Sequence, residues 1–118
     1  MHQLPDDFST LLPLREPTFL ILLSLAEGEK HGYAILKDVT ELSQERVILS
    51  TGTLYEALVR LLDQALIERI DTQEVQHPGK ARKAYRLTLK GQRVIEAETV
   101  RLQNLLAVAR RRLGSEGG

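Results

Sequence analysis

The sequence predicts a mainly α-helical fold with one small β-hairpin and a long helix at its C-terminal end. Before residue 64, a nearly continuous apolar run is followed by two segments in which apolar residues recur at helical spacing. Two strand-like runs then flank the turn signal Pro78-Gly79. Residues 89–113 contain no proline. The order of helix, helix, helix, hairpin and long helix is that of a winged helix-turn-helix extended by one helix.

Size and composition exclude several classes of function. With 118 residues, the chain supports one domain and is small for an enzyme with its own deep pocket. It has no cysteine, and His2, His31 and His77 share no metal-ligand spacing. No paired carboxylates frame a site and no phosphate-binding glycine loop is present, so we expect no enzyme activity, metal or cofactor. Without a run of 18 apolar residues or a signal-peptide pattern, we expect a cytoplasmic protein with no membrane contact.

We divide the chain into four parts. Residues 1–14 form an N-terminal arm or short helix, residues 15–88 the winged helix-turn-helix domain, residues 89–113 the C-terminal helix, and residues 114–118 a flexible tail.

The first two helices differ in how their apolar residues are distributed. Pro17 opens and Gly28 closes a nearly continuous apolar run, as proline and glycine do at the two ends of a helix. A helix that is apolar on nearly all sides needs cover on nearly all sides, so we expect a second subunit to contact it at Phe19 and Leu22. The next helix, residues 31–42, has a narrower apolar stripe.

The third helix has the features of a recognition helix. Ser50 is a favourable N-cap, and the apolar stripe that follows comprises Leu54, Leu58, Leu61 and Leu62. Gly52 in the first turn costs on the order of 0.5 to 1 kcal/mol relative to alanine, which is understandable if a phosphate or another backbone must approach closely. Taken alone, the pattern also fits an ordinary core helix with a cap.

The hairpin carries a local excess of positive charge. The whole chain has 16 basic and 16 acidic side chains, whereas residues 79–93 contain no acidic residue. The six basic residues in that segment are Lys80, Arg82, Lys83, Arg86, Lys90 and Arg93. Alone, such a hairpin could be an edge strand protected by charge, but its position after a candidate recognition helix favours contact with DNA phosphates.

The last helix has the spacing of a helix-helix interface. Ile95, Leu102 and Ala109 recur every seven residues, with Leu105, Leu106 and Leu113 beside them. We expect this stripe to pack between two subunits; the alternative is that it folds back on its own domain.

Several motifs, taken together, resemble the PadR family of bacterial transcriptional regulators, in its short branch with a single C-terminal helix. The similarity covers roughly residues 14–110. Its motifs are Leu25-Ala26-Glu27-Gly28, His31-Gly32-Tyr33-Ala34-Ile35, Ser50-Thr51-Gly52-Thr53-Leu54-Tyr55, Leu58-Val59-Arg60-Leu61, Leu66-Ile67 and Lys83-Ala84-Tyr85-Arg86-Leu87-Thr88-Leu89-Lys90-Gly91. The resemblance implies a homodimer that binds double-stranded DNA at near-palindromic operators and, as for many members, release by a small hydrophobic effector.

The resemblance also implies where DNA is contacted. It places Gly52, Thr53 and Tyr55 at the DNA-facing end of the recognition helix, and Lys80, Arg82 and Lys83 in the wing. The base edges are expected to be read from the segment beginning at Ser50, by Thr51, Thr53, Glu56 and Arg60. Tyr33 is left open between core and contact.

The chain departs from the family pattern at three positions. Thr51 stands where proline is common, Glu56 puts an acid on the exposed face, and Ala65 replaces a glycine after the recognition helix. We expect a sequence-specific DNA-binding regulator, a homodimeric repressor. The alternative is a winged-helix module that binds protein and not DNA, which the neutral net charge and Glu56 favour.

Overall fold

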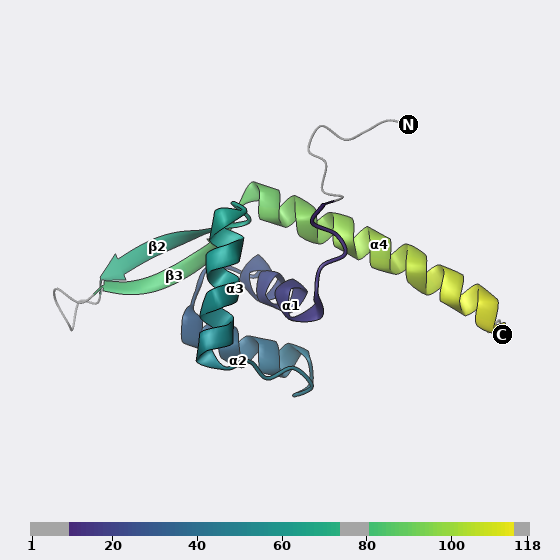
Figure 1. Cartoon of the computed structure of the whole chain (residues 1–118), viewed down its shortest axis with the longest axis horizontal. Helices are drawn as coiled ribbons and strands as arrows, with labels where there is room; N and C mark the ends of the chain where they lie inside the picture. Colours follow the sequence, from purple (N-terminus) through teal and green to yellow (C-terminus); the bar gives the residue numbers. More distant parts are fainter. Residues whose placement is uncertain (1–9, 74–80, 115–118) are drawn as a thin grey trace.

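The computed structural model describes residues 10–73 and 81–114. Its elements are α1 (Glu16–Ala26), β1 (Lys30–His31), α2 (Gly32–Leu42), α3 (Thr51–Asp63), β2 (Ile67–Gln73), β3 (Ala81–Leu87) and α4 (Leu89–Leu113). The first three helices and the sheet form a body, and the C-terminal half of α4 projects away from it (Figure 1). The predicted fold class is confirmed. The turn at Pro78-Gly79, Lys80, most of the expected N-terminal arm and nearly all of the expected tail lie outside the described residues.

The sheet has one strand more than predicted. Its antiparallel order is β1-β3-β2, so the wing hairpin of β2 and β3 gains the two-residue strand β1 on its other side. Lys30 pairs with Tyr85 and His31 with Ala84, and the His31 ring Nδ1 lies 3.1 Å from the Lys83 carbonyl oxygen. Two residues are too few to show a strand periodicity. The added strand joins the start of α2 to the wing.

The core corrects two assignments to the subunit interface. Leu22 is 0% exposed and Ile95 is also buried, both inside one subunit, so neither has surface to offer a partner. The reason is that α1 contacts α2, β3 and α4 of its own chain, which together cover most of its apolar sides. Phe19 is partly buried against the same core.

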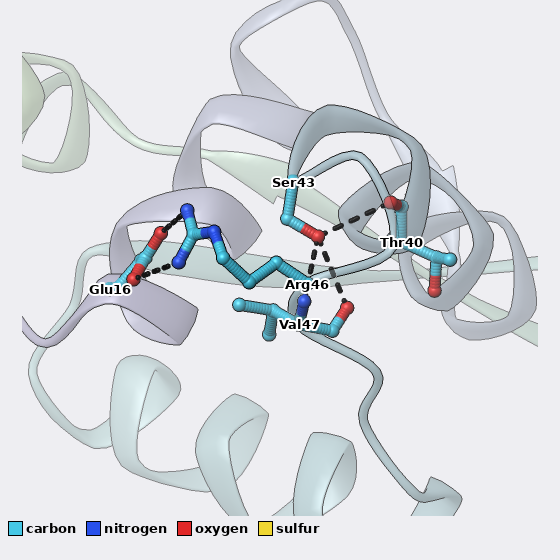
Figure 2. A network of polar contacts seen from close by, with 5 residues as sticks. All are labelled: Glu16, Thr40, Ser43, Arg46 and Val47. Atoms are coloured by element: carbon cyan, nitrogen blue, oxygen red, sulfur yellow. Dashed lines mark hydrogen bonds and ion pairs between the residues drawn. The ribbon is translucent and has the colours of Figure 1, made fainter.

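The turn between α2 and α3 is fixed by a polar network (Figure 2). Gln44 and Glu45 adopt positive φ angles of 55° and 66°. Ser43 Oγ accepts a hydrogen bond from the Val47 backbone N–H at 2.9 Å, and the Arg46 guanidinium forms a two-pronged ion pair with Glu16. Because Arg46 hydrogen-bonds it, the pKa of the Glu16 carboxyl lies below its ordinary value. The pair joins the start of α1 to the turn that leads into α3.

A turn at Ala65 follows the end of α3. Ala65 has a φ of 62°, and the backbone N–H of Leu66 donates to the carbonyl of Leu61. Alanine in this left-handed conformation costs roughly 1 to 2 kcal/mol, because its Cβ crowds the backbone. The chain therefore makes this left-handed turn without a glycine.

Glu98 anchors the segment before α1 to α4. Its side chain is 2% exposed and accepts hydrogen bonds from the Leu14 backbone N–H at 3.1 Å and from Arg101 Nε at 2.7 Å. The Arg101 hydrogen bond is the main reason that the pKa of Glu98 lies below its ordinary value. These bonds give a buried carboxylate the partners that it needs. The segment that leads into α1 is thereby held against α4.

Candidate nucleic-acid interface

The amino end of α3 is capped as the sequence predicts. Ser50 Oγ accepts a hydrogen bond from the Thr53 backbone N–H at 3.1 Å and donates one to Thr53 Oγ1 at 2.9 Å. One of the helix's otherwise unpaired N–H groups is thereby satisfied. The hydroxyl proton of Ser50 is used inside the chain, so its role is to fix the start of α3.

The faces of α3 are clearly divided. Its buried residues are Leu54, Ala57, Leu58 and Leu61. At 100° per residue, the positions opposite this stripe are Gly52, Glu56, Val59 and Asp63, and all four are exposed. We call these four residues the outward stripe. It extends from the amino end of α3 to its last turn and is the face of the helix that the core leaves uncovered.

Gly52 has space around it, unlike two other helical glycines. A Cβ atom built on Gly52 would have no other atom within 4 Å, whereas one on Gly32 would lie 2.3 Å from Tyr55 Oη and one on Gly91 2.1 Å from the Leu66 carbonyl oxygen. Packing within the chain therefore explains glycine at positions 32 and 91 but not at position 52. A close approach from outside explains it at position 52.

The Gly52→Ala variant tests that explanation. We expect the free energy of unfolding to rise by about 0.5 to 1 kcal/mol, because alanine is the better helix former and meets no obstacle. Binding to DNA should weaken, because the added methyl group holds the helix away from the groove. Urea denaturation and a DNA titration of the same preparation give the two values. A variant that is more stable and binds as tightly as wild type would contradict the close approach.

The two tyrosines near this surface have different positions. The hydroxyl end of Tyr55 packs against Gly32 at the start of α2, and Tyr55 is partly exposed. Tyr33 is 74% exposed, so it belongs to the surface and not to the core. The sequence alone did not decide between a core and a surface position for Tyr33, because a tyrosine, which has an apolar ring and a polar hydroxyl, is compatible with both. Tyr55 holds α2 against α3, and Tyr33 is an exposed aromatic side chain in the first turn of α2.

In the wing, two of the predicted basic side chains are exposed but have partners within the chain. Arg86 Nε donates to Glu68 Oε2 at 3.0 Å, and Lys90 Nζ donates to the Gln64 carbonyl oxygen at 3.1 Å. Both charges are thus bound within the chain. Lys83 is exposed on β3, opposite Asp71 of β2, and the backbone of Arg82 pairs with Thr72 one step closer to the tip.

Arg60 lies beside the outward stripe, one turn along α3 from Glu56, and is exposed. With Arg15 and Thr18 it lines two neighbouring depressions of about 280 and 180 Å³, between α3 and the start of α1. Thr53 and Glu56 line the larger depression as well. Three of the expected base-reading residues, Thr53, Glu56 and Arg60, are thus exposed and border the same depression.

The described residues, 10–73 and 81–114, contain no cluster of histidine and acidic side chains suited to a metal ion. None of the helices in those ranges is long and apolar enough to cross a membrane.

Comparison with known proteins is decisive for the family. The sequence profile of the family described as "Transcriptional regulator PadR-like family" matches residues 21–97, which run from α1 into α4. The chain belongs to this family. It is accordingly a winged-helix, DNA-binding transcriptional regulator, and members of this family are generally not enzymes.

Solved structures agree with this assignment. A PadR family transcription regulator from hypervirulent Clostridium difficile has a TM-score of 0.70 and 28% identity, over 85% of this chain and 100% of that one. Bacillus subtilis PadR, solved in complex with operator DNA, has a TM-score of 0.62 and 25% identity, over 70% of this chain and 46% of that one. An uncharacterized 37.1 kDa protein in a transposon of Streptomyces fradiae is 35% identical over 79 residues, and this chain spans 21% of its length.

Proposed function

We propose that this PadR-family regulator is a homodimeric repressor that binds a near-palindromic operator. In each subunit α3 enters the major groove and the wing contacts phosphates beside it. The observation that carries the proposal is the outward stripe, whose glycine is open to solvent at the capped end of α3. Bacillus subtilis PadR, which shares 25% identity with this chain, was solved with operator DNA, and this supports the proposal.

The dimer is proposed from α4. Beyond Thr99 nearly every side chain of this helix is exposed, including Leu102, Leu105, Leu106 and Leu113. These leucines and Ala109 lie within about 100° of one another around the helix axis. An apolar stripe of this kind on a projecting helix is what a second α4 would cover. Two subunits related by a two-fold axis would present two copies of α3, which matches a near-palindromic site.

Binding to DNA is tested with the DNA upstream of the chain's own gene. A gel-shift titration at moderate salt should show tighter binding to that duplex than to unrelated DNA of the same length. If neither duplex binds, the alternative function, a winged-helix module that binds protein and not DNA, becomes the better description.

The wing is tested by replacing Lys80, Arg82 and Lys83 with alanine. We expect affinity for operator and unrelated DNA to fall by similar factors, because phosphate contacts carry no sequence information. Each lost phosphate contact should lower the slope of log affinity against log salt by about 0.9. The control replaces Arg111 and Arg112, at the far end of α4, and should keep the wild-type slope. An unchanged slope in the wing variant would remove the wing from the interface.

We propose that a small hydrophobic effector would act at the larger depression, because Thr53 and Glu56 of α3 form part of its wall. Its apolar lining comes from Pro17, Ile21, Leu49 and Ala57. A compound in this position would contact the helix that reads DNA. Titrating hydrophobic compounds into the protein-operator complex tests this proposal. We expect at least one compound to release the DNA, and release by none would contradict the proposed role of the depression.

A further inference from the structure

Val59 is an apolar side chain in the middle of the outward stripe. It is 56% exposed, whereas its neighbours Leu58 and Leu61 are buried in the core. Valine is also a weaker helix former than alanine or leucine, because its branched side chain loses rotamer freedom in a helix. Neither core packing nor helix formation within this chain therefore explains valine at position 59.

The shape of the stripe indicates how deeply α3 enters the groove. Gly52 has no side chain, and Val59, two turns further along the same face, has a short one. A short side chain touches a base edge only if the helix backbone lies deep in the major groove. The open space around Gly52 allows such an approach at the leading end of the helix.

The chemistry of α3 restricts which bases it can read. Thr51–Asp63 contains no lysine, asparagine or glutamine. Its one arginine, Arg60, is exposed beside the outward stripe, where it borders the larger depression with Arg15 and Thr18. The outward stripe consequently lacks the side chains that read guanine and adenine with two hydrogen bonds. What it presents is an apolar group at Val59 and a carboxylate acceptor at Glu56. Their counterparts in the major groove are the thymine C5 methyl group and the cytosine amino group.

From this juxtaposition we infer that Val59 is a specificity-determining residue that contacts a thymine methyl group in each operator half-site. Glu56, one turn earlier on the same stripe, accepts a hydrogen bond from a cytosine amino group. The bases that the outward stripe itself reads are thus pyrimidines. This inference rests on the proposed insertion of α3 into the major groove.

The test removes the methyl group from the DNA. The wild-type protein first selects an operator from a random pool, and each thymine of that operator is then replaced by uracil, which pairs identically but lacks the C5 methyl. We expect one position in each half-site at which uracil weakens wild-type binding by about fourfold per half-site, the factor that burying one methyl group corresponds to. The Val59→Ala variant should bind the thymine and uracil duplexes equally at that position, with its salt dependence unchanged.

The matched control is Val100→Ala. Val100 has nearly the same exposed fraction as Val59, 54% against 56%, but it lies on α4. There it is on the opposite face of the helix from Leu102. This variant should discriminate thymine from uracil as wild type does. If no uracil substitution weakens wild-type binding, or if Val59→Ala still discriminates, the inference is wrong while operator binding stands. If the wild-type protein selects no sequence at all, the proposed function fails first.

Discussion

Replacing Leu102 and Leu106 with glutamate should abolish the dimer and reduce operator affinity by at least about 100-fold. Both side chains are exposed on the projecting half of α4 in the single subunit, so the substitutions create no cavity in its own core. In the proposed dimer they would bury four unpaired carboxylates, and burying unpaired charge costs several kcal/mol for each group. A monomer engages one half-site and loses the gain from joining two binding events, which is commonly 10² to 10⁴ in affinity. Light scattering and an operator titration measure the two effects.

The opposite face of the same helix provides the control. At 100° per residue, Val100 and Asn104 lie about 160° and 200° from Leu102 around the helix. Replacing these two with glutamate adds the same charge at the same spacing and should leave the dimer and its operator affinity close to wild type. If the Leu102 and Leu106 variant remains a dimer of wild-type stability, the interface lies elsewhere, and the partly exposed Phe19 on α1 becomes the place to look.

Local signals in the sequence predicted the recognition helix well. The cap at Ser50 and the buried residues Leu54, Leu58 and Leu61 follow from residues within one or two turns of one another, so nothing distant in the chain was needed. The wing was predicted for the same reason, since two strands and a turn signal are close in sequence. The ion pair between Glu68 and Arg86 in the wing was not predicted, because it forms only once the register of β2 and β3 is fixed.

Contacts between distant segments account for what the sequence could not predict. Apolar periodicity shows that Leu22 and Ile95 need cover, but it does not say whether the cover comes from the same chain. The strand β1 forms because residues more than fifty positions away present a free edge. In the candidate site, the need for glycine at position 32 becomes clear only when α2 and α3 are placed together, because Tyr55 of α3 occupies the space of a Cβ atom there. The depression that Glu56 and Arg60 border with Arg15 and Thr18 likewise exists only once α1 is placed beside α3.

A contact with a distant segment also explains why residue 91 is a glycine. We expect Gly91→Ala to be among the most destabilising single substitutions in this protein. Alanine is ordinarily the better residue inside a helix. Here its Cβ would lie 2.1 Å from the Leu66 carbonyl oxygen and 2.8 Å from Leu87 Cδ1, distances that require the backbone to move. We expect the free energy of unfolding to fall by about 3 kcal/mol, the upper part of the range for overpacking. Urea denaturation followed by circular dichroism, at one fixed protein concentration, measures it.

The loss should come from the junction between the wing and α4. The same Leu66 carbonyl accepts the Thr88 backbone N–H at 3.1 Å, and Thr88 Oγ1 caps α4 by accepting the Gly91 N–H at 3.0 Å. A shift that relieves the clash therefore strains the bond and the cap together. Gly52→Ala is the matched control, because it makes the same change in the first turn of α3, where nothing lies within 4 Å, and its stability should change in the opposite direction. Equal effects of the two substitutions would show that helix propensity, and not the contact with Leu66, decides the outcome at Gly91.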